Sequence, residues 1–546
     1  MSPTRSSTTT PTTRPRAPRT PARVAFVGAG PGDAGLLTLR AAEYLAEADA
    51  VLLDRVARED VVTRCCRAAV EVVDAGHGDP GQPLTTASRA KLVVRTAKAN
   101  PGGLVVRLMD GDPATFNGLA EEATACARAG VPFEVVPGVS AVSAVPVYAG
   151  VPLTAGASRS VHVLLAGDRR PDVAAVLDNA ATVVVIGAPE AVASTLRAVL
   201  AAGRDPATPL AVTERGTTVD QSTVVTTLAE ASTVLGASTA PALAVLGPTV
   251  GLRESLSWFE TRPLFGWNVL VPRTKEQSGT MTARLERYGA RSTVVPTISV
   301  EPPRTPQQME RAVKGLVTGR YEWVGFTSVN AVRAIREKFT EFGLDARSFA
   351  GLKVAAVGGV TAEALLEWGI NPDLVPSEEQ SARGLLEEWP PFDDLLDPIN
   401  RVFLPRADIA TDTLVAGLQE MGWEVDDVTA YRTVRAAPPA AEVRDAIKGG
   451  AFDAVVFTSS STVRNLVGIA GKPHPNTVVA CIGPATAKTA EELGLRVDVL
   501  APEPASAAVV DALADHGRTL AMTAGEAGES VLRPSQRKTA SRRRAR

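Results

Sequence analysis

The 546-residue sequence is poor in aromatic residues, cysteine and histidine, which limits the chemistry that it can carry. Aromatic residues make up 4% of the chain, so small aliphatic side chains must do most of the packing in a sequence that is 45% hydrophobic. The four cysteines form no C-x-x-C and no Cys/His cluster, which argues against a zinc site or a disulfide framework. No apolar run approaches the roughly 20 residues of a membrane span. We therefore expect a cytoplasmic protein with reduced thiols and no bound metal.

Positive charge is scarce in the body of the chain and concentrated at its two ends. Residues 1–23 carry five arginines and no acid, and residues 537–546 carry six positive charges, although the net charge of the chain is −3. The body between them is acidic, which argues against a general nucleic-acid binder. Residues 1–22 lack the apolar helical face of a transit peptide, so we predict a disordered tail there. A second, basic disordered tail is predicted for residues 518–546, where periodicity is lost.

From Val24 to about Val250, short apolar runs alternate with amphipathic helical stretches. Residues 24–28 and 50–54 have the composition of strands, and residues 36–48 have that of a helix. This alternation predicts an α/β fold with a parallel sheet. The pattern breaks at residues 254–267, so we place a domain boundary near Arg262, between domains 23–262 and 263–517.

An internal repeat with a period near 130 residues fills the second domain. Residues 269–274 match 402–407, residues 322–335 match 452–466, and residues 353–369 match 478–494. A period this long indicates two similar α/β lobes rather than a solenoid. A cleft between two such lobes is a common place for a ligand.

A glycine-rich turn, GAGPGD at residues 28–33, stands between a predicted strand and a helix. One interpretation is a dinucleotide-binding turn with Asp54 as its ribose-binding acid, which would make the protein a dinucleotide-dependent oxidoreductase. However, Asp33 occupies the third glycine position of that motif, where a carboxylate would lie close to a pyrophosphate.

Five segments in order resemble the uroporphyrinogen-III C-methyltransferases: residues 24–56, 105–116, 133–154, 209–228 and 257–267. The resemblance implies a tetrapyrrole-methylase fold, with two α/β lobes around S-adenosylmethionine and a homodimer through this domain. It also implies which residues line the methyl donor: Pro31, Asp110, Gly111, Asp112, Thr115, Ser140, Ala141, Ile186 and Gly216. Asp54 matches the proton acceptor of the family, and methylation of a pyrrole carbon does leave a proton to remove.

The sequence departs from the methyltransferase pattern at four places. Asp110 replaces a glycine, Ile186 ends a strand that usually carries a Tyr–Met pair, and His77 replaces a lysine. The stretch from Asn117 to Glu122 lacks the usual arginine. Since arginine and lysine make the strong contacts to substrate carboxylates, an alternative is that the domain is a non-catalytic module.

Residues 268–516 resemble uroporphyrinogen-III synthase, a family of two α/β lobes joined by a strand ladder. The resemblance implies cyclisation of hydroxymethylbilane to uroporphyrinogen III with inversion of the last pyrrole ring. Hydroxyls at strand-to-helix turns are candidates to hold the substrate's carboxylates: Ser328, Thr361, Ser459, Ser460 and Thr486. Arg273 and Arg406 are further candidates, because each follows one of the matched repeat strands.

Tyr431 is the candidate acid of the second domain. In the repeat alignment it corresponds to Ile298, so packing alone accepts an aliphatic side chain at that position. A phenol there can help the terminal hydroxyl of the substrate to leave. Together the two domains predict a bifunctional enzyme that makes uroporphyrinogen III and methylates it with S-adenosylmethionine towards precorrin-2.

Overall fold

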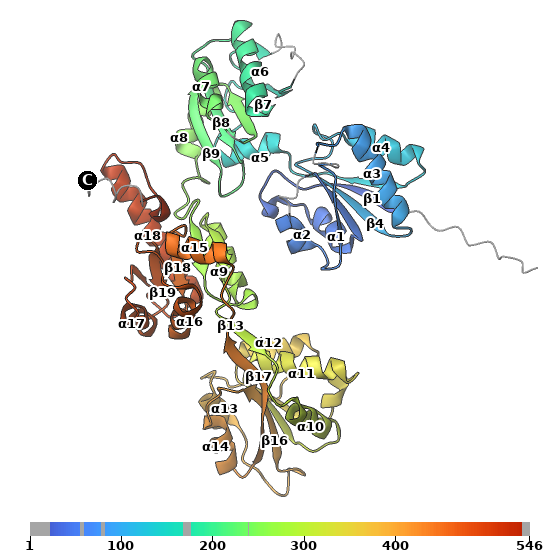
Figure 1. Ribbon diagram of the computed structural model, residues 1–546, viewed down its shortest axis with the longest axis vertical. Helices are drawn as coiled ribbons and strands as arrows, with labels where there is room; N and C mark the ends of the chain where they lie inside the picture. Colours follow the sequence, from blue (N-terminus) through green and yellow to red (C-terminus); the bar gives the residue numbers. More distant parts are fainter. Residues whose placement is uncertain (1–21, 55–58, 78–81, 168–175, 239, 538–546) are drawn as a thin grey trace, which may run out of the picture. The chain divides into compact units, whose positions relative to one another are not determined.

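The computed structural model describes residues 22–54, 59–77, 82–167, 176–238 and 240–537, and it forms two compact units, Met1–Gly266 and Trp267–Arg546 (Figure 1). The division falls after Gly266 rather than at Arg262, because Phe265 packs against Phe259, whose ring contacts Tyr148 of the first unit. The predicted amino-terminal tail lies outside the described residues, apart from Ala22. None of the helices in the described ranges is long and apolar enough to cross a membrane.

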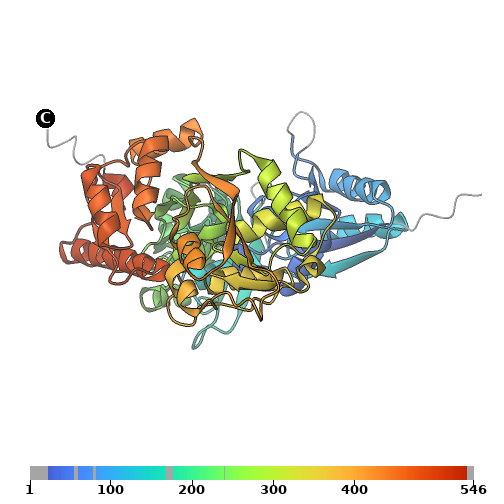
Figure 2. The ribbon, with the colours of Figure 1, turned by 90° about the horizontal axis from the view of Figure 1, so that it is seen from below.

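A five-stranded parallel sheet with strand order β3-β2-β4-β1-β5 begins the first unit. Its strands are β1 (Arg23–Gly28), β2 (Ala50–Leu53), β3 (Glu71–Asp74), β4 (Leu104–Met109) and β5 (Phe133–Val136). Helices α1 (Leu39–Glu47) and α2 (Glu59–Cys65) cover one face, and α3 (Thr86–Ala99) and α4 (Leu119–Arg128) cover the other. Figure 1 shows α1 and α2 on one side of the blue strands and α3 and α4 on the other, and Figure 2 gives the view from below. The predicted parallel α/β architecture is confirmed for this part of the chain.

The second sheet of the first unit is mostly antiparallel, which corrects the prediction that the parallel pattern continues to about Val250. Its order is β6-β7-β10-β8-β9, and only β6 and β7 run parallel. The strands are β6 (Val161–Leu165), β7 (Thr182–Gly187), β8 (Pro209–Glu214), β9 (Ser222–Thr227) and β10 (Ala242–Leu246). Helices α6 (Pro189–Ala201) and α7 (Ala231–Gly236) pack on one face, and α5 (Ala141–Tyr148) packs on the other. The short turn between β8 and β9 makes an antiparallel hairpin, which a strand–helix count does not reveal.

The second unit contains two five-stranded sheets. The first has the order β12-β11-β18-β19-β20 and comprises β11 (Asn268–Val271), β12 (Arg291–Val294), β18 (Ala454–Phe457), β19 (Val478–Cys481) and β20 (Val499–Leu500). The other has the order β13-β17-β16-β14-β15 and comprises β13 (Ile298–Glu301), β14 (Trp323–Phe326), β15 (Lys353–Ala356), β16 (Arg401–Ala407) and β17 (Glu424–Arg435). All pairs are parallel except β13 with β17.

Ten helices in the described part of the second unit connect these strands. They are α9 (Lys275–Arg287), α10 (Pro306–Val317), α11 (Val329–Glu341), α12 (Gly359–Glu367), α13 (Ala382–Glu388), α14 (Thr413–Glu420), α15 (Ala441–Gly449), α16 (Ser460–Ala470), α17 (Pro484–Glu492) and α18 (Ser506–Glu526). The first sheet combines β11 and β12 of the first repeat with β18 to β20 of the second, and the other sheet combines β13 to β15 with β16 and β17. Each lobe is therefore built from both repeats, and the predicted lobes do not coincide with the repeats.

The predicted end of the second domain at residue 517 is wrong. Helix α18 continues through Arg518 to Glu526, because the following residues, including Leu520 and Met522, are good helix formers. Beyond it, Pro534 is buried, and the backbone N–H of Ser535 donates to Asp453 Oδ1 at 2.9 Å. The carboxylate of Asp453 is itself buried, so the segment up to residue 537 belongs to the folded unit.

A chain ending at residue 517 is therefore expected to unfold at a lower temperature than a chain ending at residue 537. The shorter chain leaves one oxygen of the buried Asp453 without its donor, which costs about 1–3 kcal/mol. Differential scanning calorimetry of the two chains measures the difference. Equal midpoints for the transition of the second unit would contradict this placement of the carboxy-terminal segment.

Candidate functional site

Three turns meet at the carboxyl edge of the first sheet, after β1, β4 and β5. Gly30 and Gly111 exchange backbone hydrogen bonds of 3.2 and 2.8 Å, which join the first two turns. A Cβ atom at Gly28 would lie 2.6 Å from the carbonyl oxygen of Gly111 and from the nitrogen of Gly138. Only glycine permits this approach of three backbones, so the turns form a cradle of main-chain atoms. We call the turns at residues 28–33, 110–112 and 138–140 the glycine cradle.

The predicted donor-binding residues of the first sheet lie in or beside this cradle. Pro31 is in its first turn, and Asp110, Gly111 and Asp112 form the second. The backbone N–H of Thr115 donates to the carbonyl oxygen of Asp112 at 3.2 Å. These residues are thus brought together as the sequence predicts, although their contacts with a ligand stay a prediction.

Helix α5 begins at the third turn of the cradle. The hydroxyl of Ser140 caps this helix by accepting from Val142, and Ala141 is its first residue. A helix that begins here points free backbone N–H groups and a partial positive charge towards the cradle.

Asn117 braces the second turn from the stretch that lacks an arginine. Its Nδ2 donates to the carbonyl oxygens of Asp110 and Asp112, both at 2.6 Å. Phe116 beside it has a φ of 64°, a left-handed conformation that is unusual for a bulky residue. Asn117 therefore fixes the second turn, within a stretch that lacks the arginine expected from the resemblance.

The loop after β8 reaches the cradle from the second sheet. The backbone N–H of Asp33 donates to Thr217 Oγ1 at 3.1 Å, and a Cβ at Gly216 would collide with Val145 of α5. Ile186, at the end of β7, belongs to the same apolar cluster as Val145. The predicted residues Gly216 and Ile186 are therefore linked to the cradle through α5.

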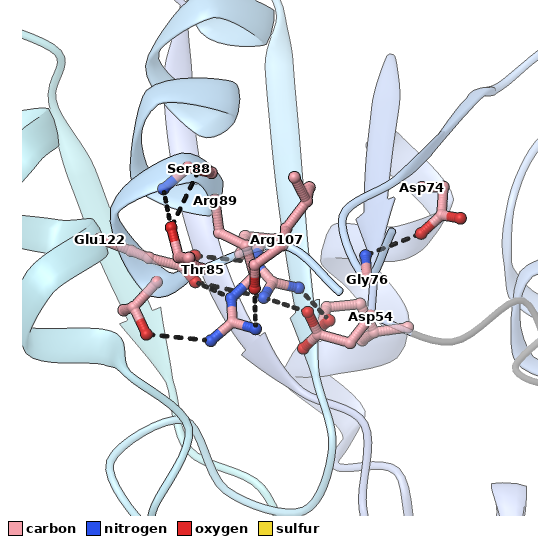
Figure 3. Close-up of polar contacts among 11 residues, drawn as sticks. Asp54, Asp74, Gly76, Thr85, Ser88, Arg89, Arg107 and Glu122 are labelled. Carbon is pink, nitrogen blue, oxygen red and sulfur yellow. Dashed lines mark hydrogen bonds and ion pairs between the residues drawn. The ribbon is translucent and has the colours of Figure 1, made fainter. Parts of the chain in front are cut away.

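Asp54 follows β2 directly at the same edge and is held by Arg107, as Figure 3 shows. Its Oδ1 accepts from Arg107 Nη2 at 2.6 Å, and its side chain is 24% exposed. Arg107 and Glu122 have no exposed side-chain surface, and Arg107 Nε lies 2.8 Å from Glu122 Oε2. Arg89 of α3 lies 3.3 Å from Glu122 Oε1. We call Asp54, Arg107, Glu122 and Arg89 the Asp54 network.

Electrostatics favours the charged form of Arg107. Burial alone lowers the pKa of Arg107, but the hydrogen bond that Arg107 donates to Glu122 and the charges of Asp54 and Glu122 outweigh that effect and raise it. The turn of Asp74, Gly76 and His77 packs directly against Asp54, where a Cβ at Gly76 would overlap the Asp54 carbonyl oxygen. The edge of the sheet thus presents a partly exposed carboxylate on a rigid support.

In the second unit, Tyr431 is buried and its hydroxyl lies 2.9 Å from Ser328 Oγ. Ser328 also caps α11 by accepting from Ala331. The register of β16 with β17 shifts between Arg406 and Ala407, so that Tyr431 rather than Ala430 pairs with Ala407. The sequence reasoning joined Tyr431 and Ser328 only as members of one domain, whereas the structure brings their hydroxyls together.

The other predicted hydroxyls all lie at carboxyl ends of strands, in two groups. Thr361 belongs to the sheet that carries Tyr431, whereas Ser459, Ser460 and Thr486 belong to the first sheet of this unit. Ser459 caps α16, and Ser460 donates to Ala485 O at 3.0 Å, so these two hydroxyls have structural partners. Thr361 and Thr486 are buried in the first turns of α12 and α17.

The two candidate arginines differ in what they contact. Arg273 is partly buried and donates to Ser506 Oγ at 3.2 Å, and burial lowers the pKa of its guanidinium. In contrast, Arg406 is buried and forms a two-pronged ion pair with Asp427, with Nε 2.6 Å from Oδ1, and it also donates to Thr411 O. Arg406 is committed to its own strand neighbours, which argues against its predicted contact with a substrate carboxylate. Among the described residues, no group of His, Cys, Asp or Glu side chains has the arrangement of a metal site.

Comparison with known proteins assigns both units. The family model of the tetrapyrrole (corrin/porphyrin) methylases matches residues 23–232, and that of uroporphyrinogen-III synthase HemD matches residues 279–511. A porphyrin biosynthesis protein HemD of Ruminiclostridium josui is 30% identical over 506 residues, which cover 90% of this chain and 98% of the relative. The chain belongs to this family of fused tetrapyrrole methylases and uroporphyrinogen-III synthases. Both predicted resemblances are thereby confirmed.

Other relatives match less than half of the chain. Siroheme synthase 1 of Yersinia pseudotuberculosis is 37% identical over 245 residues, which cover 44% of this chain and 51% of that protein. The chain thus spans about half the length of this relative. A solved structure of a uroporphyrin III C-methyltransferase from Thermus thermophilus is 34% identical to this chain. The match covers 42% of this chain and 100% of that protein, with a TM-score of 0.37.

Sequence reasoning missed Arg107, Glu122 and Arg89. One signal was available, since Arg107 interrupts the otherwise apolar run of β4, LVVRLM. In a strand buried on both faces, a lone arginine must have a buried anionic partner. The identity of that partner, Glu122 on α4, follows only from the fold.

Replacement of Glu122 by glutamine is expected to lower the free energy of unfolding of the methylase domain by about 3 kcal/mol, because it leaves the buried Arg107 with half of its counter-charge. Urea unfolding of the full chain measures this. The matched control is Glu121→Gln on the same helix, since Glu121 is exposed and is expected to change stability by less than about 0.5 kcal/mol. Equal effects of the two substitutions would contradict the buried ion pair.

Proposed function

We propose that the chain is a bifunctional enzyme that cyclises hydroxymethylbilane to uroporphyrinogen III and then methylates this product towards precorrin-2. The observation that carries the proposal is the position of Asp54, a partly exposed carboxylate at the same sheet edge as the glycine cradle. The match to both families over one chain supports the pairing of the two reactions.

The glycine cradle fits S-adenosylmethionine, because its surface is main chain that a Cβ would fill. Pro31, Gly111 and Gly216 would allow close approach, and the first turn of α5 at Ser140 and Ala141 would present N–H donors. Asp110, Asp112, Thr115 and Ile186 would complete the contacts. When bound, this cofactor supplies the methyl group. Asp54 would then take a proton from the methylene bridge next to the methylated pyrrole, which neutralises the positive charge left by methylation.

In the synthase domain, Tyr431 donates a hydrogen bond to the departing hydroxyl of hydroxymethylbilane, and Ser328 orients its phenol. Arg273 is the cation that we assign to a substrate carboxylate, because no described acid pairs with it and its guanidinium is partly desolvated. Thr361 and Thr486 lie at helix amino-termini that can accept further carboxylates. Holding the linear substrate folded supplies part of the catalysis, since correct positioning is worth up to roughly 7–11 kcal/mol.

A second candidate is an active synthase with a non-catalytic methylase-like module. The observations that favour it are the amide of Asn117 and the imidazole of His77 at positions where cations would meet an octacarboxylate substrate, together with Asp110 and Ile186 in the donor site. The geometry of Asp54 favours the active enzyme, because a non-catalytic domain has no need of a buried network to support one carboxylate.

One experiment separates these candidates. The full chain is supplied with hydroxymethylbilane, with and without S-adenosylmethionine, and the tetrapyrroles are identified by mass spectrometry. The bifunctional enzyme gives uroporphyrinogen III alone without the cofactor and methylated product with it. Unmethylated uroporphyrinogen III in both reactions, with no heat of S-adenosylmethionine binding in calorimetry, would establish the second candidate.

Tyr431→Phe is expected to slow ring closure at least about tenfold, because it removes the proton donor while it keeps the ring. The rate of uroporphyrinogen III formation from hydroxymethylbilane measures the effect. The matched control is Tyr321→Phe, which removes another buried hydroxyl of the same sheet, bonded to Asp426 at 2.7 Å. Unchanged formation of the III isomer by Tyr431→Phe would refute the assigned role.

Asp54→Asn is expected to lower methyl transfer about 10²- to 10⁴-fold, as for loss of a general base, and to leave the affinity for S-adenosylmethionine within about threefold. Asp49→Asn is the matched control, since Asp49 precedes the other end of β2 and its Oδ2 accepts from Leu104 N at 2.9 Å. Methyl transfer by Asp54→Asn at the wild-type rate would remove Asp54 from the mechanism.

A further inference from the structure

Arg107 is a costly residue for its position. It lies on the central strand β4, on the face covered by α3 and α4, among Val105, Met109 and Cys126. An apolar side chain of similar size often stabilises a protein more than a buried ion pair does. The stability of the sheet therefore does not explain a guanidinium at this position. The contacts of Arg107 at the edge of the sheet do explain it.

The bonds of Arg107 leave it one orientation. Its Nε donates to Glu122, its Nη1 to the carbonyl oxygen of Leu108 at 3.0 Å, and its Nη2 to Asp54 Oδ1. Glu122 is held from its other side by Arg89, whose Nε lies 3.3 Å from Oε1. Every nitrogen of the guanidinium is thus committed, so one oxygen of Asp54 is fixed in direction.

The other oxygen of Asp54 is left for chemistry. Asp54 Oδ2 accepts no hydrogen bond from any side chain or backbone group in the described ranges, and the side chain keeps 24% of its surface exposed. A carboxylate that is fixed through Oδ1 and open at Oδ2 has the geometry of a proton acceptor.

We propose that Arg107 is the positioning residue of the proton acceptor Asp54, and that Glu122 holds Arg107 in place for this task. The inference rests on the proposed methyltransferase function. Methylation of a fully substituted pyrrole carbon leaves a positive charge on the ring. A C–H bond of the neighbouring methylene bridge then breaks, its electron pair forms a double bond that neutralises this charge, and its proton forms an O–H bond at Asp54 Oδ2. Arg107 keeps its own proton throughout and fixes the direction of Asp54 for the transfer.

The competing explanation is that Arg107 only ties β4 to α4. The chain offers a matched control for it in Arg204, which is 1% exposed and lies in the same unit. Arg204 donates to the backbone carbonyls of Val176 and Ala181 at 2.6 and 2.9 Å, and forms no ion pair with a described carboxylate. Replacement of either arginine disturbs buried structure, but only Arg107 contacts Asp54.

The test compares Arg107→Gln with Arg204→Gln in the full chain, by kcat and KM for methylation of uroporphyrinogen III. Loss of the bond that fixes Oδ1 leaves Asp54 free to turn, so kcat should fall at least about tenfold while KM stays within about threefold. Arg204→Gln should leave kcat per folded molecule unchanged. Arg107→Lys, which keeps a charge, should lie between wild type and Arg107→Gln.

Glu122→Gln provides a second readout. It removes the anion that holds Arg107, so kcat should fall in the same direction as in Arg107→Gln. A purely structural tie would lower the amount of folded protein in these variants without lowering kcat per folded molecule. An unchanged kcat per folded molecule in both Arg107→Gln and Glu122→Gln would overturn the inference while wild-type methylation upholds the proposed function. Absence of methylation by the wild-type chain would overturn both.

Discussion

A guanidinium without exposed surface organises the carboxyl edge of the first sheet. Arg107 joins β4 to α4 through Glu122, to α3 through Arg89 beyond it, and to β2 through Asp54. Desolvation of such an ion costs several kcal/mol, and the cost is offset only while both carboxylates stay in place. The four elements are therefore held to one arrangement at their ends, while apolar packing holds them elsewhere. A site that must present a carboxylate in one direction benefits from this all-or-none support.

The glycine cradle lies beside the Asp54 network and fixes the backbone rather than a side chain. Three backbones approach so closely at Gly28, Gly111 and Gly138 that side chains are excluded, and the surface offers N–H and C=O groups that need no reorganisation. Asn117 extends the same principle, because its amide holds the carbonyl oxygens of Asp110 and Asp112. The fixed main chain of the cradle and the buried ion pairs of Arg107 beside it together form a rigid site. In the proposed function, the cradle binds the methyl donor and Asp54 accepts the proton.

How much of the structure could be predicted from the sequence depends on how far apart the interacting residues lie along the chain. Ordered motifs such as GAGPGD and the repeated strands near Arg273 and Arg406 carried the fold class and both family resemblances, because local turn chemistry is written in contiguous residues. Partners distant along the chain were not accessible. Arg107 is 15 residues from Glu122 and 53 from Asp54 along the chain. Arg406 forms an ion pair with Asp427, which argues against its predicted contact with a substrate carboxylate. The hairpin of β8 and β9 and the continuation of α18 past Arg518 were missed because composition does not define strand direction or helix ends.

The synthase domain shows how duplication supplies a site and divergence specialises it. Because each sheet combines strands of both repeats, neither repeat can bury its strands alone, and the two lobes must form together. The duplication places matching strand-to-helix turns, with Ser328 and Ser459 as caps, on both sheets. Tyr431 places a phenol beside the Ser328 cap, whereas its counterpart in the repeat alignment, Ile298, is an aliphatic residue on the neighbouring strand β13 of the same sheet. Under the proposed function, two similar edges with helix amino-termini suit a substrate with many similar carboxylates, whereas the phenol of Tyr431 suits a reaction that must begin at one end of a linear chain.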